Sequence, residues 1–147
     1  MANETIYVKG TQKTLMSAGA SIANNAIGTA TTANYDAVVD GAGFPDAEFV
    51  LGVTFTVAPT ENSVIVLLAQ QLDIDGTNDA DVPETTRLGR VIGSFVVNNT
   101  TTTQYIPLFA RDLPLLATYY LYNNATGQAI SANWTLKVTP RSYKAAP

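Results

Sequence analysis

The stretch YYLYNNATGQAISANWTLKVTP, residues 119–140, decides the fold class of this chain. Two runs in which large apolar residues alternate with polar ones flank a centre of Asn, Gly, Gln and Ser. This pattern predicts a β-hairpin with an exposed turn at residues 123–131. In the second run Trp134, Leu136 and Val138 share one face of the strand, so we expect Trp134 to lie in the core.

The tyrosines of the first run fall on both faces of the predicted strand. Tyr119 and Leu121 face one way, and Tyr120 and Tyr122 face the other. One of these pairs is exposed or is covered by another subunit, and strand phase leaves open which one. Because β-sandwiches often present Tyr and Trp platforms to sugar rings, a carbohydrate-binding module is the alternative function that this stretch suggests.

The rest of the chain predicts further short strands. Residues 47–57 alternate and predict a strand with one buried face, whereas residues 63–69 are apolar on both faces and predict a central strand that pairs with the first as an antiparallel hairpin. Shorter strands are predicted at residues 5–8, 13–16, 90–97 and 104–109. Roughly seven to nine strands without a helix predict an all-β antiparallel β-sandwich, in the form of a jelly roll, with a closed barrel as the main rival.

The N-terminal part of the chain has a different composition. Residues 17–34 are almost wholly small or polar, and they carry no helical apolar stripe. They predict an extended arm or edge strands, with a loosely packed edge hairpin as the alternative. We therefore divide the chain into an arm with edge strands at residues 1–46 and a sandwich body at residues 47–147, within one domain.

The composition excludes most catalytic machinery. The chain has no Cys and no His, so disulfides, thiolate zinc sites and Ser-His or Cys-His pairs are absent, and no glycine-rich loop of the phosphate-binding kind occurs. We expect no enzyme. Only 14% of the residues are charged. Surfaces so poor in charge are often partly covered by other subunits, although Thr and Asn can also solvate them, and we expect a homo-oligomer.

Charge and hydropathy limit the partners. The net charge of −4 includes no Lys/Arg cluster, so nucleic acid is not an expected partner. No window approaches the ~20 apolar residues of a membrane span, and the N-terminus lacks an apolar signal region. We expect a protein made in the cytoplasm without membrane association.

The acidic stretch DIDGTNDADVPE, residues 73–84, suggests a calcium loop. Its candidate ligands are Asp73, Asp75, Asp79, Asp81 and Glu84. Calcium takes carboxylate oxygens of this kind, but Gly76 stands fourth in the stretch where a calcium loop has its glycine sixth. The preceding strand and Pro83 exclude an EF-hand. The alternative is a solvated loop between strands, and no other cofactor is expected.

Six stretches together carry a resemblance to a known family. They are SIANNAIGTA (21–30), GFPDAEFV (43–50), DIDGTNDAD (73–81), IGSFVV (92–97), TTTQYI (101–106) and YYLYNNATGQAISANWTLKVTPRSY (119–143). In these stretches the chain resembles small virion structural proteins of tailed bacteriophages, of the capsid cement or decoration type. The resemblance covers most of the chain, and its C-terminal part is the most specific.

The resemblance implies a structural role without catalytic residues. Cement proteins are commonly β-sandwich or jelly-roll proteins that sit on the major capsid protein lattice and stabilise the head. The expected partners are therefore the major capsid protein and neighbouring copies of this chain, and the expected location is the capsid exterior of a virion assembled in the host cytoplasm. A tail protein or another virion component is the alternative within the same resemblance.

We expect the contact with partners to involve residues 17–46. A small-residue arm allows close backbone approach and strand addition at a low desolvation cost. The predicted contact residues, which include one of the two tyrosine pairs of the predicted hairpin, are Ile22, Asn24, Asn25, Ile27, Tyr35, Phe44, Tyr120 and Tyr122.

Overall fold

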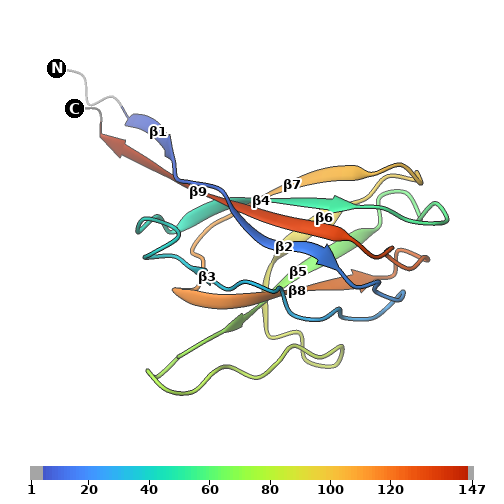
Figure 1. Ribbon diagram of the computed structural model, residues 1–147, viewed down its shortest axis with the longest axis horizontal. Helices are drawn as coiled ribbons and strands as arrows, with labels where there is room; N and C mark the ends of the chain where they lie inside the picture. Colours follow the sequence, from blue (N-terminus) through green and yellow to red (C-terminus); the bar gives the residue numbers. More distant parts are fainter. Residues whose placement is uncertain (1–4, 146–147) are drawn as a thin grey trace.

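The computed structural model describes residues 5–145 of the chain, and over these residues the protein is all-β. Two curled antiparallel sheets pack face to face as a β-sandwich (Figure 1). The strands are β1 (Thr5–Lys9), β2 (Lys13–Gly19), β3 (Tyr35–Asp36), β4 (Asp46–Val53), β5 (Val64–Gln71), β6 (Arg90–Val96), β7 (Gln104–Ala110), β8 (Leu116–Asn124) and β9 (Trp134–Ala145). The predicted fold class is therefore confirmed at the level of an antiparallel sandwich.

The strand order shows that most connections cross from one sheet to the other. The five-stranded sheet has the order β1-β9-β4-β7, with β2 also paired to β9, and the four-stranded sheet has the order β3-β8-β5-β6. Among the described strands, β5 and β6 are the one pair of sequence neighbours that hydrogen-bond to each other. The loop at residues 72–89 joins these two strands.

Both predicted hairpins are wrong. β8 and β9 belong to different sheets, and so do β4 and β5. Alternation within a strand shows which face is buried, but it does not show which neighbour the strand pairs with. The connection at residues 125–133 is long enough to cross the ~10 Å between packed sheets, and Ala125 and Asn133 at its ends adopt positive φ angles of 56° and 69°.

The predicted core face of β9 is confirmed. Trp134, Leu136 and Val138 are buried between the sheets. The indole Nε1 of Trp134 donates a hydrogen bond to the carbonyl oxygen of Ala20 at 2.7 Å, which satisfies the one polar group of the largest core side chain. A Cβ atom built at Gly19 would lie 2.0 Å from Cε2 of the Trp134 ring, so the indole occupies the space that any larger residue would need.

The structure also shows which face of the sheet each tyrosine of β8 occupies. Tyr119 and Leu121 lie in the main core, while Tyr120 faces the opposite side of the four-stranded sheet. There Tyr120 packs with Val66 and Leu68, and five partly buried residues pack against this cluster, which are Ile27, Ala30, Val64, Leu88 and Tyr122. The chain itself therefore covers this sheet on both faces around β5, as predicted for residues 63–69.

The segment between β2 and β3 provides part of that cover. Backbone N–H groups of Asn25, Gly28 and Thr31 donate to carbonyl oxygens of β8 at 2.8, 2.9 and 2.8 Å. Isolated bridges also join Ile22 to Ile130 and Ile27 to Tyr122. In this structure the small-residue segment lies along β8 of its own chain, which explains how a stretch with little apolar surface is held in place.

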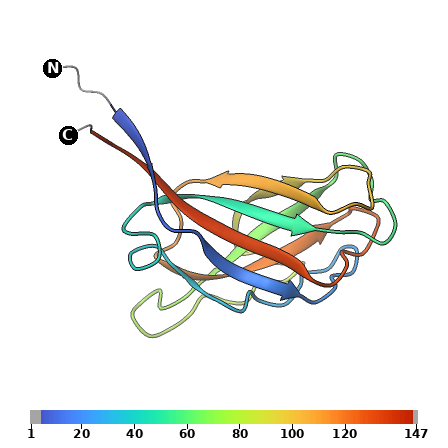
Figure 2. The ribbon, with the colours of Figure 1, turned by 45° about the horizontal axis from the view of Figure 1, so that its top comes forward.

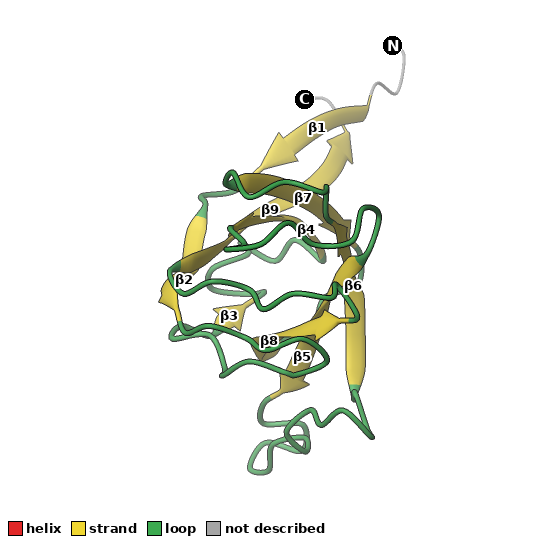
Figure 3. Ribbon diagram, turned by 90° about the vertical axis from the view of Figure 1, so that its right-hand side faces the viewer, coloured by secondary structure: helices red, strands yellow, loops and turns green. Residues whose placement is uncertain are grey.

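The first strand and the end of the last strand extend beyond the sandwich. β1 pairs only with residues 141–145 of β9, whereas β2 and β4 pair with the part of β9 that lies over the core. Figures 1 and 3 show this two-stranded ribbon standing clear of the body. In Figure 2 the red β9 runs continuously from the sandwich into the ribbon.

Removing the hydroxyl group is expected to change the free energy of unfolding differently at two buried tyrosines, Tyr119 and Tyr120. The hydroxyl of Tyr119 is buried with no hydrogen-bond partner among the described residues, and burial raises its pKa. We expect Tyr119→Phe to leave the free energy of unfolding unchanged or to raise it by about 1 kcal/mol, because a buried unpaired hydroxyl is removed. The control Tyr120→Phe removes the 2.9 Å bond that Tyr120 Oη donates to Gln70 Oε1 and should cost about 1 kcal/mol.

Urea denaturation of the two variants measures this difference. Equal losses of stability in Tyr119→Phe and Tyr120→Phe would show that the hydroxyl of Tyr119 has a partner after all.

Candidate interaction face

The exposed aromatic side chains gather on one side of the molecule. Tyr7, Tyr105, Phe109 and Tyr143 are 46%, 74%, 43% and 63% exposed, and among the described residues no other aromatic side chain is as exposed. All four lie on the outer face of the five-stranded sheet, on β1, β7 and β9. We call this surface, made of these four residues, the aromatic face.

Strand alternation on β7 explains how two of these rings reach the surface. Ile106 and Leu108 pack against the core cluster, so Tyr105, Pro107 and Phe109 point outward. Pro107 also removes a backbone donor from an edge strand, which protects that edge against unwanted pairing. The alternation in QYIPLFA, residues 104–110, is enough to predict the outward direction of Tyr105 and Phe109, but sequence reasoning did not identify them as a surface.

One hollow on the aromatic face combines three rings with an ion pair. Its volume is about 440 Å³, and its lining residues are Tyr7, Glu48, Phe109, Arg141 and Tyr143. Arg141 Nη2 lies 2.6 Å from Glu48 Oε2, and the Arg141 guanidinium lies 5.3 Å from the centroid of the Tyr7 ring. The Tyr7 and Tyr143 centroids are 5.1 Å apart with the rings tilted by 59°.

A second hollow lies at the other end of the face. It has a volume of about 380 Å³, and no charged residue lines it. Tyr105 borders it, with its ring over Gly52, where an added Cβ atom would lie 3.2 Å from Tyr105 Cε1 and 2.5 Å from Thr135 Oγ1. The absence of a side chain at Gly52 therefore lets the exposed Tyr105 ring lie close to the sheet.

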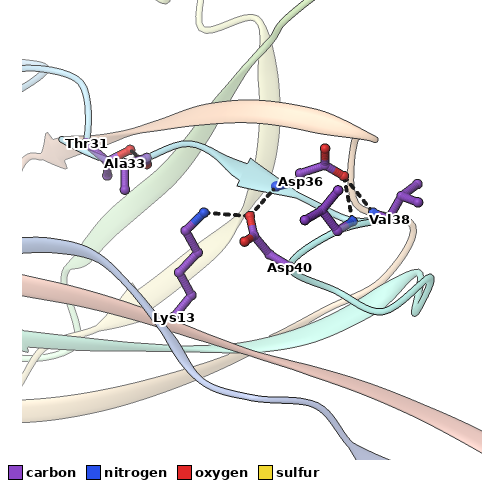
Figure 4. A network of polar contacts seen from close by, with 7 residues as sticks. Lys13, Thr31, Ala33, Asp36, Val38 and Asp40 are labelled. Atoms are coloured by element: carbon purple, nitrogen blue, oxygen red, sulfur yellow. Dashed lines mark hydrogen bonds and ion pairs between the residues drawn. The ribbon is translucent and has the colours of Figure 1, made fainter.

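A third hollow, with a volume of about 630 Å³, lies between the start of β2 and the turn after β3. An ion pair joins these two elements, with Lys13 Nζ 2.6 Å from Asp40 Oδ2 (Figure 4). Asp40 Oδ2 also accepts a hydrogen bond from the backbone N–H of Asp36. Burial by itself would raise the pKa of Asp40, but the bonds from Lys13 and Asp36 outweigh it and the pKa is lowered. The pair fastens β2 to the β3 turn.

The pH dependence of this ion pair follows from the sign of the shift. Because folding lowers the pKa of Asp40, its contribution to stability is fully present above the carboxyl's unfolded pKa of about 3.9 and is lost as the pH falls from there through the lower folded pKa. The network therefore has a structural role at neutral pH.

The predicted contact residues lie away from the aromatic face, and several are not accessible. Ile22, Tyr35 and Tyr120 are buried within the chain. Asn24 and Asn25 are exposed, but their Oδ1 atoms each accept a 3.0 Å hydrogen bond, from the N–H groups of Gly127 and Ala125. Ile27, Phe44 and Tyr122 are half-buried. Contact of these eight residues with a partner stays a prediction.

The acidic loop does not bring its carboxylates to a common point. Asp75 accepts hydrogen bonds from backbone and side-chain N–H groups of Asn78 and from Thr77, and these bonds lower its pKa. Asp79 accepts from the N–H of Asp73, and Asp81 pairs with Arg87. Glu84 bridges to Arg87 through the backbone. Calcium binding by Asp73, Asp75, Asp79, Asp81 and Glu84 stays a prediction, and within residues 5–145 no group of three or more acidic, His or Cys side chains is arranged to hold a metal ion.

No helix in the described part of the chain is long and apolar enough to cross a membrane. Comparison of the chain with protein-family models, with curated proteins and with solved structures finds no match.

Proposed function

We propose that this chain is a virion structural protein of a tailed phage, of the capsid cement or decoration type, which binds the major capsid protein lattice and neighbouring copies of itself. The observation that carries the proposal is the aromatic face. The outer face of the four-stranded sheet is covered by its own chain around Tyr120, whereas the five-stranded sheet presents Tyr7, Tyr105, Phe109 and Tyr143 without cover among the described residues. The proposal assigns the chain no catalytic role.

The proposed sandwich is a jelly roll. Its support is the strand order, in which β2-β9-β4-β7 faces β3-β8-β5-β6 and seven of the eight connections between sequence-adjacent strands join strands that do not pair. Eight strands arranged as two Greek keys have this pattern, and jelly rolls occur in both viral capsid and lectin domains. In the same proposal, the extended N-terminal arm comprises residues 1–46, and within it β1 leaves the body (Figure 1).

The energetics of the aromatic face suit a docking surface. Tyrosine and other aromatic residues dominate the binding energy of protein interfaces because they bury a large area at a small cost in side-chain entropy. Arg141 and Glu48 form an ion pair at 2.6 Å. A partner that covers this face therefore buries a neutral pair and no isolated charge. Repetition over a lattice then turns a weak single contact into a strong one.

A binding assay with undecorated heads tests the proposal. The heads are assembled from the major capsid protein of the genome that encodes this chain, and the variant is Tyr105→Ser with Phe109→Ser. Removing two exposed rings should weaken binding by about 30-fold or more, the effect of losing one interface hot spot, with little change in stability. The control is Val91→Ser with Val96→Ser, which removes two half-exposed apolar side chains from β6 and should bind like wild type.

A folded Tyr105→Ser, Phe109→Ser variant that still binds heads like wild type would contradict the proposed face. Absence of wild-type binding to heads, together with binding to tails, would favour the alternative of another virion component.

The carbohydrate-binding alternative is favoured by one observation. The hollow of about 440 Å³ combines Tyr7, Phe109 and Tyr143 with the polar groups of Arg141 and Glu48, and sugars are bound by such combinations of rings and hydrogen-bonding groups. A glycan array separates the two functions. Specific sugar binding that Phe109→Ser abolishes, without any effect on head stability, would support the alternative.

A further inference from the structure

The free edge of β1 is a backbone edge that the fold leaves unpaired. β1 pairs with β9 on one side, and no described strand pairs with its other side. Unlike β7, which carries Pro107, β1 has no proline in its sequence TIYVK. A two-stranded ribbon is at best marginally stable in water, so this element gains from the addition of further strands.

The hydrogen-bonding direction of each β1 residue follows from one contact. Gly10 N–H donates to the Pro140 carbonyl oxygen at 2.8 Å, on the register that pairs Lys9 with Arg141. Because direction alternates along an antiparallel strand, Val8 and Ile6 turn their N–H and C=O groups toward β9. Thr5, Tyr7 and Lys9 therefore turn theirs toward the free edge.

We propose that the free edge of β1 pairs antiparallel with β1 of a second copy about a two-fold axis at Tyr7, which makes a continuous β9-β1-β1-β9 sheet across two chains. In this register Tyr7 faces Tyr7 of the other copy, and both direct their N–H and C=O groups into the new ladder. Ile6 then faces Val8, and Thr5 faces Lys9. Every residue of β1 is paired, with apolar residues opposite apolar ones.

The self-complementarity of TIYVK is the reason to choose a second copy as the occupant. A two-fold contact needs a surface that is complementary to itself. In this strand the opposed side chains are of compatible type on both faces of the sheet. The two Lys9 side chains are about 14 Å apart along the strands, which exceeds the ~8 Å screening length at physiological salt. No like charges are therefore placed opposite each other.

The side chains on the outer face support the same contact. Tyr7 and Tyr143 already lie 5.1 Å apart within one ribbon, and both are exposed. Pairing at Tyr7 places the two Tyr7 rings next to each other, so that four tyrosines from two chains form one row across the new sheet. The contact buries rings that a single chain leaves in water.

This inference names the contact between copies that the proposed function requires, and it is tested without capsids. Sedimentation over a dilution series measures the mass of wild type, Tyr7→Pro and Tyr7→Phe. We expect wild type and Tyr7→Phe to reach twice the 15.6 kDa chain mass at high concentration. Tyr7→Pro should stay at the single-chain mass, since proline removes the N–H that faces the second copy and not one that faces β9.

Single cysteines test the register in a chain that has no cysteine of its own. Directly opposed Cα atoms in a hydrogen-bonded pair are about 5.5 Å apart, within the range of a disulfide. Tyr7→Cys should therefore form a disulfide-linked dimer under oxidation, whereas Thr5→Cys, with its two copies about 14 Å apart, should not.

A single-chain mass for wild type at every concentration, or equal crosslinking of the two cysteine variants, would overturn the inference. If Tyr7→Pro is a single chain and still binds heads, the inference stands and the proposed capsid contact stands with it. If wild type pairs as described but does not bind heads, only the proposed function fails.

Discussion

Replacing Asn123 by Asp is expected to destabilise the protein by about 3–5 kcal/mol at neutral pH, the cost of an unpaired buried charge. The Asn123 side chain is fully buried, and its Nδ2 donates to the carbonyl oxygens of Ile22, Ala23 and Gln128 at 3.2, 3.2 and 2.8 Å. Its Oδ1 accepts a 2.6 Å bond from Thr126 Oγ1. An aspartate of the same shape would place a carboxylate oxygen against three carbonyl oxygens.

The pH dependence of Asn123→Asp separates this cause from a simple packing defect. Burial and the three carbonyl oxygens favour the neutral carboxyl, so the pKa of the introduced Asp is raised in the folded state. The electrostatic penalty is therefore absent below the unfolded pKa of about 3.9 and grows as the pH rises through the interval up to the folded pKa. Urea denaturation at acidic and neutral pH measures the difference.

The neighbouring residue supplies the control. Asn124 lies next in β8, is partly exposed, and faces the opposite side of the sheet. Asn124→Asp should change the free energy of unfolding by no more than about 0.5 kcal/mol at either pH. Equal losses in the two variants, or a loss in Asn123→Asp that does not depend on pH, would contradict the role assigned to the amide.

Replacing Gly19 by Val is expected to cost about 3 kcal/mol, because the new side chain cannot fit. An added Cβ atom at Gly19 would lie 2.0, 2.2 and 2.4 Å from three atoms of the Trp134 indole. Trp134 cannot move easily, since it is buried between the sheets and its Nε1 donates to the Ala20 carbonyl oxygen. The residue and the ring therefore compete for one volume.

The control for this substitution is Ala18→Val, one residue earlier on β2, where the side chain is exposed. Valine favours a strand, so Ala18→Val should change stability by at most about 0.5 kcal/mol. Thermal and urea unfolding compare the two variants. A Gly19→Val protein as stable as Ala18→Val would mean that the indole does not occupy the position described.

Asn123 also marks a limit of local sequence reasoning. The stretch YNNATG predicts an exposed turn from residue 123 onward, but Asn123, Thr126 and Ile130 are all buried. Asn and Thr are typical of turns because they hydrogen-bond to nearby backbone, and the same ability lets them satisfy buried carbonyl groups. Composition does not separate the two uses. The carbonyl groups that decide between them belong to Ile22 and Ala23, which are distant in the chain.

The aromatic face also shows what local sequence reasoning can and cannot predict. The alternation of β7 is visible in the sequence, so the outward direction of Tyr105 and Phe109 could have been predicted from the inward direction of Ile106 and Leu108. That Tyr7 and Tyr143 join them depends on the pairing of β1 with β9 across most of the chain length. The sequence similarly leaves open whether Tyr120 is covered, and the structure shows that segments around Ile27 and Leu88 cover it.

The sequence by itself determined the all-β class, the approximate positions of the strands other than β3, the burial of both faces of β5 and the inward face of β9, including the burial of Trp134. These properties follow from a two-residue period that each strand carries within itself. Only the tertiary structure decided which strands pair, which sheet the chain covers with its own residues and which face it leaves aromatic and open. Those properties depend on contacts between residues far apart in the chain, and a local pattern of apolar and polar residues is compatible with more than one such pairing.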